Sequence, residues 1–191
     1  MLNNKKLLLA SASPRRRELL SKLDADTEIV KLHDVDESYP DDLAPEKVPE
    51  YIATLKRDAY DRSMLGDGEV LVTADTVVIL DGKVLGKPHS EEEAREMLAM
   101  MSGRRHKVVT GVTLTSRDRS VVFSDETLVK FAELTSAEID YYVERYRPLD
   151  KAGAYGIQEW IGYIGIEGIV GCYYNVMGLP LNKLYQHLRE L

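Results

Sequence analysis

The chain has 191 residues, a formal net charge of −7, 44% hydrophobic and 30% charged residues, and one cysteine. This length and composition predict one soluble globular domain over residues 1–191. The acidic charge argues against nonspecific nucleic-acid binding, and the single cysteine excludes an internal disulfide and favours a reducing, cytoplasmic compartment. No apolar stretch has membrane-spanning length and the start lacks a signal segment, so we expect neither nucleic acid nor membrane as a partner.

The first predicted strand, residues 7–10, leads into a helix with Ser13 as its N-cap and Pro14 in its first turn. Three arginines at positions 15–17 share that turn, where the helix dipole disfavours cations unless an anion binds. Backbone N–H groups, hydroxyls and guanidinium groups at one helix start suit a phosphate. The alternative is a solvated basic turn, and this stretch alone does not decide between the two.

Residues 27–32 predict a second strand that ends in an acidic segment, residues 33–38, which includes Asp36 and Glu37. Clustered carboxylates repel one another unless they are solvated or bind a cation, and Mg²⁺ or Mn²⁺ suits such oxygen-rich groups. A solvated loop is the simpler interpretation of this segment by itself. Residues 48–63 predict a helix in which Lys56 either extends into a cleft or, as the simpler interpretation, lies at the surface with its stem buried.

The strongest strand signal is EVLVTADTVVIL, residues 69–80, which predicts a central strand that is buried on both faces. Asp75 lies within it, where an ionised carboxylate is costly unless a ligand or a catalytic task accounts for it. Asp81 and Gly82 predict a hairpin turn, after which Lys87 would return towards Asp75 as a phosphate-binding cation. A plain turn lysine is the alternative.

The remaining chain continues the alternation of helices and strands. Helices are expected at residues 90–102, from residue 135 or 136 to residue 147, and at 180–191, strands at 107–115 and 120–131, and a solvated basic turn at 104–106. In the glycine-rich stretch between the last two helices, the Gln158 amide could recognise a base edge, and Asp150 with Lys151 could form an ion pair. The pattern predicts an α/β fold with a mixed, twisted sheet flanked by helices.

Several short motifs resemble, in family order, those of the Maf (septum formation protein-like) nucleotide pyrophosphatases. They are SASPRR at 11–16, ADTVV at 74–78, GKP at 86–88, SG at 102–103 followed by His106, TGV at 110–112, DKAGAYGIQ at 150–158 and NVMGLP at 175–180. The segment AYGIQ resembles the branch that acts on dTTP and UTP. Two departures, Glu159 for a common glycine and Cys172 for a common serine, concern base preference more than reaction type.

The resemblance implies hydrolysis of a nucleoside triphosphate to the monophosphate and pyrophosphate, assisted by Mg²⁺ or Mn²⁺, in a house-cleaning role. It implies two lobes around a deep cleft, as in inosine triphosphatase-like enzymes, and a homodimer is an expectation from the family alone. Alternatives are an inosine/xanthosine or 7-methyl-GTP pyrophosphatase, or a noncatalytic nucleotide-binding regulator of cell division.

The resemblance also implies roles for individual residues. Asp75 corresponds to the catalytic acid, described as a proton acceptor, and it would act as metal ligand, general base or both. The matching functional positions also include Lys56, Lys87 and Glu37, with the metal held through Glu37 and Asp75, or through Glu37 and Asp36 as the alternative. Substrate would be bound by Ser13, Arg15, Arg16, Thr76 and Gln158, of which Arg15, Thr76 and Gln158 are the specificity positions.

Overall fold

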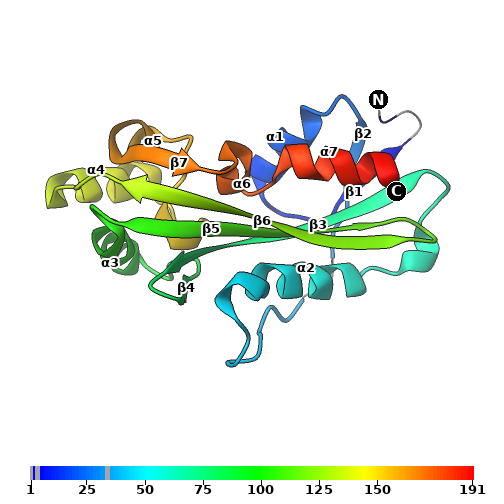
Figure 1. Cartoon of the computed structure of the whole chain (residues 1–191), viewed down its shortest axis with the longest axis horizontal. Coiled ribbons are helices and arrows are strands. Elements are labelled where there is room, and N and C mark those ends of the chain that lie inside the picture. Colours follow the sequence, from blue (N-terminus) through cyan, green and yellow to red (C-terminus); the bar gives the residue numbers. More distant parts are fainter. Residues whose placement is uncertain (1, 3–4, 33–34) are drawn as a thin grey trace. The chain divides into compact units, whose positions relative to one another are not determined.

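The computed structural model describes residues 2, 5–32 and 35–191. Its strands are β1 (Lys6–Leu9), β2 (Asp26–Ile29), β3 (Glu69–Leu80), β4 (Lys83–Leu85), β5 (Arg105–Thr115), β6 (Ser120–Phe131) and β7 (Ile166–Val170) (Figure 1). Its helices are α1 (Pro14–Ser21), α2 (Val48–Asp58), α3 (Glu91–Met101), α4 (Ser136–Tyr146), α5 (Trp160–Gly165), α6 (Tyr173–Met177) and α7 (Leu181–Glu190). The predicted alternation of strands and helices is confirmed.

The strands form one mixed sheet of seven strands in the order β2-β1-β3-β5-β6-β7, with β4 paired to β3. β1 is parallel to β2 and β3, whereas the β3–β4 hairpin and the β6–β7 pair are antiparallel. β3 therefore lies between two other strands and is almost entirely buried, as its apolar sequence predicts. The predicted mixed sheet flanked by helices is confirmed.

The chain divides into two compact units. Unit 1 comprises Met1–Asp75, Thr110–Asp125 and Gly178–Leu191, and unit 2 comprises Thr76–Val109 and Glu126–Met177. The long strands β3, β5 and β6 each contribute one part to each unit. The predicted two lobes correspond to these units, while the cleft and the single-domain assignment stay predictions.

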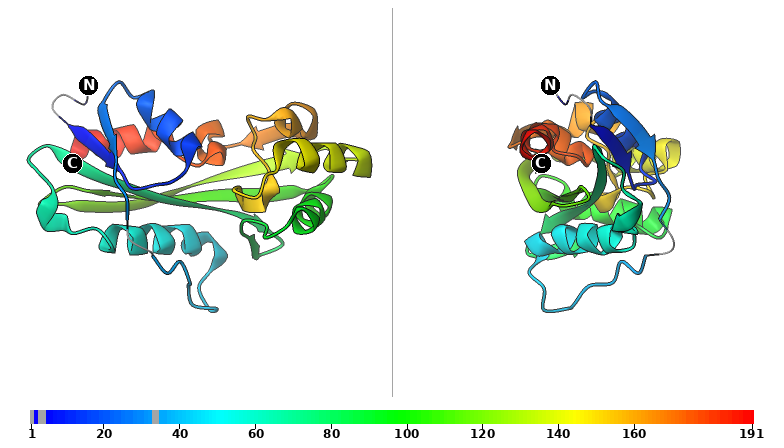
Figure 2. Two further views of the ribbon diagram at one scale, coloured as in Figure 1. Left: turned by 180° about the vertical axis from the view of Figure 1, so that it is seen from behind. Right: turned by 90° about the vertical axis from the view of Figure 1, so that its right-hand side faces the viewer.

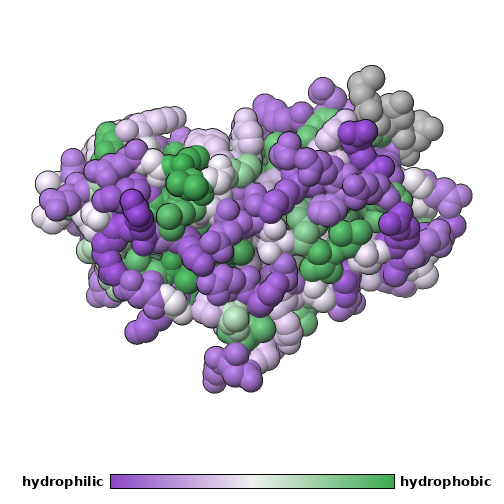
Figure 3. Space-filling model, in the orientation of Figure 1, coloured by the Kyte–Doolittle hydropathy of each residue, from purple (hydrophilic) through white to green (hydrophobic). Residues whose placement is uncertain are grey.

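In unit 1, α2 and α7 cover opposite faces of β6 (Figure 2). The ring of Phe123 packs 4.3 Å, between centroids, from His187 of α7. The hydroxyl of the next residue, Ser124, donates to Glu50 Oε1 of α2 over 2.6 Å. Because successive strand residues point to opposite faces, these two contacts place the helices on opposite sides. Polar residues cover most of the molecular face drawn in Figure 3, with separate apolar patches between them.

The start of α2 packs directly onto β5 in unit 1. A Cβ added at Gly111 would lie 2.3 Å from the carbonyl carbon of Pro49 and from the backbone nitrogen of Glu50. No real Cβ tolerates that distance, so only glycine allows the helix to approach the strand so closely. This contact fixes where α2 begins relative to the sheet, and with it the position of every residue further along the helix.

Unit 2 has its own apolar core, built where α3 and α4 pack together beside the sheet. The fully buried members include Ala94, Leu98, Met101, Phe131, Tyr142 and Ile161. Ser90 caps α3 by accepting from Glu93 N, and Thr135 caps α4 in a reciprocal capping box with Glu138. The expected caps and inner faces of both helices are therefore confirmed.

Three sequence-based expectations were wrong in detail. The strand expected to reach residue 32 is β2, which ends at Ile29. The helix expected to reach Ser63 ends at Asp58, because Asp61 caps a separate short 3-10 turn by accepting from Ser63 N. His106, expected in a solvated turn, is 2% exposed within β5.

Candidate active site

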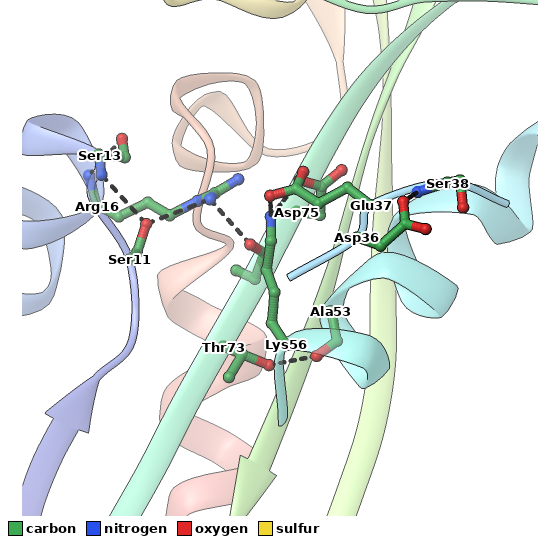
Figure 4. A network of polar contacts seen from close by, with 11 residues as sticks. Ser11, Ser13, Arg16, Asp36, Glu37, Ser38, Ala53, Lys56, Thr73 and Asp75 are labelled. Atoms are coloured by element: carbon green, nitrogen blue, oxygen red, sulfur yellow. Dashed lines mark hydrogen bonds and ion pairs between the residues drawn. The ribbon is translucent and has the colours of Figure 1, made fainter. Parts of the chain in front are cut away.

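Three of the predicted site residues meet directly in unit 1. The ammonium of Lys56 lies 2.9 Å from Asp75 Oδ1 and 3.1 Å from Glu37 Oε1, so one cation is shared by two carboxylates (Figure 4). The side chains of Lys56 and Asp75 are 13% and 14% exposed, and that of Glu37 is 47% exposed. The surface position that seemed simpler for Lys56 is wrong, because its side chain is largely buried beside Asp75. The solvated loop is confirmed for Asp36, Glu37 and Ser38, which are exposed in an irregular segment, and Glu37 reaches Lys56 from that loop.

The register between α2 and β3 explains this meeting. The buried hydroxyl of Thr73 donates to the carbonyl of Ala53 over 2.6 Å. Asp75 is two residues further along the strand and Lys56 three residues further along the helix, so each stays on the same face as its predecessor. The Thr73–Ala53 bond, visible in Figure 4, therefore sets Lys56 opposite Asp75.

The acidic segment contributes Glu37 and not Asp36 to this group. The Asp36 carboxylate accepts from the backbone N–H of Ser38 over 2.9 Å, and hydrogen bonds from Ser38 lower the pKa of Asp36. In Figure 4, Asp36 points towards Ser38 while Glu37 points towards Asp75. The remaining acidic-segment positions, 33 and 34, lie outside the described residues.

The predicted phosphate-binding turn holds Arg16 beside the same strand. Arg16 Nε donates to the carbonyl of Gly178 and Nη1 to the carbonyl of Ala74, both over 2.9 Å, and Nη1 also lies 3.4 Å from Ser11 Oγ. Burial lowers the pKa of Arg16, and the negative charge of Asp75 partly offsets this effect. The guanidinium remains charged, as arginine does in proteins. The two carbonyl partners were not predicted from the sequence, since nothing in their residue types marks them.

Ser13 occupies the N-cap position of α1 as predicted. Its hydroxyl accepts from the backbone N–H of Arg16 over 3.4 Å, and Pro14 follows at the first helical position. Arg15 is half-buried in the first turn of α1. The turn thus presents basic side chains within unit 1, and their contact with phosphate stays a prediction.

The other predicted site residues, Lys87, Thr76 and Gln158, belong to unit 2. Lys87 is exposed just after β4, and the preceding carbonyl of Gly86 accepts from Gly153 N over 3.0 Å. Thr76 is half-buried in β3. Adjacent strand residues alternate between faces, so Thr76 and Asp75 lie on opposite faces of β3.

Gln158 has an unsatisfied polar atom in unit 2. Its side-chain oxygen Oε1 is buried and has no hydrogen-bond partner among the described residues. Buried polar atoms are rarely left unsatisfied, and such an exception calls for an explanation. Its backbone carbonyl, in contrast, accepts from the hydroxyl of Tyr163 over 3.0 Å. An exogenous donor facing Oε1 would account for the unsatisfied acceptor.

A second polar group in unit 2 comprises Tyr142, Asp150, Lys151 and Glu159. The predicted Asp150–Lys151 ion pair is present at 2.7 Å, and Lys151 also pairs with Glu159 Oε1 at 3.2 Å. Tyr142, expected only as an apolar face residue of α4, donates its hydroxyl to Glu159 Oε2. Glu159 itself was marked in the sequence only by its departure from a glycine that is common in the family.

Residues that fit a divalent cation are present, although fewer than a complete ligand shell. Over residues 2, 5–32 and 35–191, no cluster of three or more His, Cys, Asp or Glu side chains could hold a metal. Asp75 and Glu37 nevertheless converge on one cation, the Lys56 ammonium. Mg²⁺ commonly needs only one or two carboxylates, with water and substrate phosphate completing its shell, so this pair of residues fits.

Comparison with known proteins places the chain in a family. The family model of the Maf-like proteins matches residues 6–191, and the chain belongs to that family. A relative from Bacteroides thetaiotaomicron is 55% identical over 190 residues, covering 100% of this chain and 98% of the relative, and is named dTTP/UTP pyrophosphatase. Relatives from Porphyromonas gingivalis (55% identity, 99% and 96% covered) and Flavobacterium psychrophilum (44%, 97% and 94%) carry the same name.

Among solved structures, a HAM1 protein from Coxiella burnetii has a TM-score of 0.53 at 16% sequence identity, covering 98% of this chain and 100% of the other. At that identity the likeness concerns the fold alone, and it agrees with the predicted α/β architecture. Within the part of the chain that the structure describes, every helix is too short or too polar to cross a membrane.

Proposed function

We propose that this chain hydrolyses dTTP and UTP to the nucleoside monophosphate and pyrophosphate. The observation that carries the proposal is the Lys56 ammonium shared by Asp75 and Glu37. It occurs in a chain that aligns over its whole length with relatives named dTTP/UTP pyrophosphatase at up to 55% identity. A carboxylate can accept a proton from an attacking water molecule, and a cation beside it can stabilise negative charge on the phosphate.

In the proposed reaction a water molecule attacks the α-phosphorus of the substrate. A new bond forms between the water oxygen and that phosphorus, and the bond to the oxygen that bridges the α- and β-phosphates breaks. Asp75 accepts the proton of the water, and pyrophosphate leaves with the bridging oxygen. Lys56 orients Asp75 and neutralises charge that develops on the phosphates, because catalysis of phosphoryl transfer is largely positioning and electrostatic stabilisation.

We further propose that Glu37 and Asp75 hold Mg²⁺ or Mn²⁺ when the triphosphate binds. The metal would supply charge neutralisation at the phosphate oxygens and a lowered pKa of its bound water. Ser13, Arg15, Arg16 and Lys87 would bind the phosphates through hydroxyl, guanidinium and ammonium groups. Each of these roles rests on residue chemistry and on the family's matching positions.

Base preference is proposed to rest on Gln158, with Arg15 and Thr76. The buried acceptor Oε1 of Gln158 suits the N3–H of thymine or uracil, while its amide nitrogen would donate to O4. Cytosine has an acceptor at N3 and a donor at its 4-amino group, so an amide held in this orientation would leave both of its groups unpaired. A site built to hydrogen-bond one pattern rejects the other because buried polar groups are then unsatisfied.

The direct test is release of pyrophosphate from a panel of dTTP, UTP, CTP, GTP, ITP, XTP and 7-methyl-GTP, each with Mg²⁺, with Mn²⁺ and with EDTA. We expect turnover of dTTP and UTP with metal, at least about tenfold above CTP and GTP in kcat/KM, and its loss with EDTA. A preference for ITP, XTP or 7-methyl-GTP would show that dTTP and UTP are not the main substrates. Nucleotide binding without pyrophosphate release would show that the chain is not a pyrophosphatase.

Two further expectations belong to this proposal. A homodimer is proposed from the family alone, and sedimentation equilibrium of the purified chain measures it directly. A cytoplasmic location is proposed from the single cysteine, Cys172, and cell fractionation tests it.

A further inference from the structure

The carboxylate of Glu159 is fixed at both oxygens although the residue borders the proposed base-binding amide. Oε1 pairs with Lys151 at 3.2 Å and Oε2 accepts from the hydroxyl of Tyr142. The side chains of Lys151 and Glu159 are 9% and 21% exposed, and Tyr142 is fully buried. We call these three residues the Glu159 network. A buried charge pair with an added hydrogen bond holds one geometry strongly.

The network is tied to the backbone turn that carries Gln158. The hydroxyl of Tyr142 accepts from Gly156 N over 3.0 Å, and Glu159 N donates to Gly156 O over 3.0 Å. Burial, followed by the hydrogen bond to Glu159, raises the pKa of Tyr142, so the phenol stays a neutral donor. Helix α4 and the turn of residues 156–159 are therefore joined through a single hydroxyl.

Steric contacts bring Gln158 into the same arrangement. A Cβ at Gly156 would lie 2.9 Å from Glu159 Cδ and 3.1 Å from Gln158 Nε2. The two side chains thus fold over a position that has no side chain of its own. The Glu159 carboxylate therefore shares one space with the Gln158 amide, whose Oε1 is the unsatisfied buried acceptor.

We propose that the Glu159 network positions the Gln158 amide for a pyrimidine base and thereby sets base selectivity; this inference rests on the proposed function. Glu159 itself acts through Gln158, as a positioning residue. The preference for thymine or uracil therefore depends on a charged residue that stands where many family members have glycine.

The test compares kcat and KM for dTTP and CTP in the wild type, in Glu159→Gln and in a matched control, Glu167→Gln. Glu167 forms an exposed ion pair with Lys130 in the same unit. We expect Glu159→Gln to raise KM for dTTP about tenfold with kcat changed less than about threefold, and to change kcat/KM for CTP less than about twofold. The control should match the wild type for both nucleotides.

A merely structural role would lower kcat/KM for dTTP and CTP by the same factor, and that result would overturn the inference. A wild type that does not prefer dTTP to CTP would overturn the proposed substrate, whereas a selective wild type with an equally selective Glu159→Gln would overturn only the positioning role. Tyr142→Phe, which removes one hydroxyl and keeps the ring, should reproduce the KM shift if Glu159→Gln fails to fold.

A double-mutant cycle separates action through Gln158 from a direct effect. In a Gln158→Ala background, Glu159→Gln should change KM for dTTP less than about twofold, because the group that it positions is already absent. A full tenfold rise in that background would contradict the inference. Calorimetric affinity for α,β-imido-dUTP, measured on the same four variants, should follow the same pattern without any turnover.

Discussion

Lys56 in unit 1 and Lys151 in unit 2 are each held between two carboxylates, and the two groups differ in the other contacts that hold them. Lys56 pairs with Asp75 and Glu37, and Lys151 pairs with Glu159 and Asp150. In both groups one carboxylate is largely buried and the other is about half exposed. Because the two lysines are paired in the same way, the contacts around each group show how the two groups differ.

The group in unit 2 is locked into the scaffold, because Tyr142 joins Glu159 to a helix and to a backbone turn. The group in unit 1 includes Glu37, which lies in an irregular segment and is 47% exposed. A carboxylate that reaches its lysine from such a segment can exchange that partner for a ligand at low cost. We infer that the unit 2 group is held rigid, as a group that positions Gln158 requires, whereas the unit 1 group can exchange one of its partners for a ligand.

The largest expected effect is on turnover in unit 1. Asp75→Asn keeps the shape of the side chain but removes the proton acceptor, so kcat for dTTP should fall about thousandfold. The melting temperature should stay within a few degrees of the wild type. Asp81→Asn on the adjacent hairpin turn is the matched control, since Asp81 is exposed and its positive φ suits asparagine. Near-normal turnover in Asp75→Asn would remove Asp75 from the mechanism.

The paired substitutions Lys151→Met and Lys56→Met test the comparison itself. Lys151→Met strands the Glu159 carboxylate inside the scaffold and should lower the free energy of unfolding by about 3 kcal/mol. Lys56→Met should cost less, about 1 kcal/mol, because the charge of Arg16 still acts on Asp75 and water can reach Glu37, while kcat falls about hundredfold. Urea unfolding and pyrophosphate release measure the two quantities. Equal destabilisation by both substitutions would break the contrast.

The sequence was sufficient for most of the helices and strands, although α5, β7 and α6 in the glycine-rich stretch were not predicted from it. Apolar patterning, caps and turn residues act locally, which is why β3, α3 and the Asp81–Gly82 hairpin were predictable. The Lys56–Asp75 pair was not, because it depends on a register set by the Thr73–Ala53 bond. That hydrogen bond joins residues that are 20 positions apart in the chain, so no local sequence pattern predicts it.

Backbone partners were equally inaccessible to sequence reasoning. Arg16 is held by the carbonyls of Ala74 and Gly178, and every residue has a carbonyl, so no residue type marks these two. His106 was misplaced for a related reason. Its basic neighbours suggested a solvated turn, whereas the strand alternation that buries its ring depends on pairing with distant strands.

His106 gives the smallest of these effects and extends the comparison to pH. Its ring lies 5.0 Å from that of Phe131, between centroids, and its Nε2 is 2.7 Å from the hydroxyl of Tyr155. Burial lowers the pKa of His106 from 6.5 to about 4. Between pH 6.5 and about pH 4, His106 is therefore protonated in the unfolded chain but neutral in the folded chain.

Stability should consequently fall as the pH drops through this window, by about 2 kcal/mol between pH 7 and pH 5. His106→Gln, which keeps a hydrogen-bonding group beside Tyr155, should remove most of that loss, whatever it costs at pH 7. His89→Gln, at an exposed position, should leave the acid dependence as in the wild type. Urea unfolding at both pH values measures the difference, and an unchanged slope in His106→Gln would show that the acid sensitivity arises at other groups.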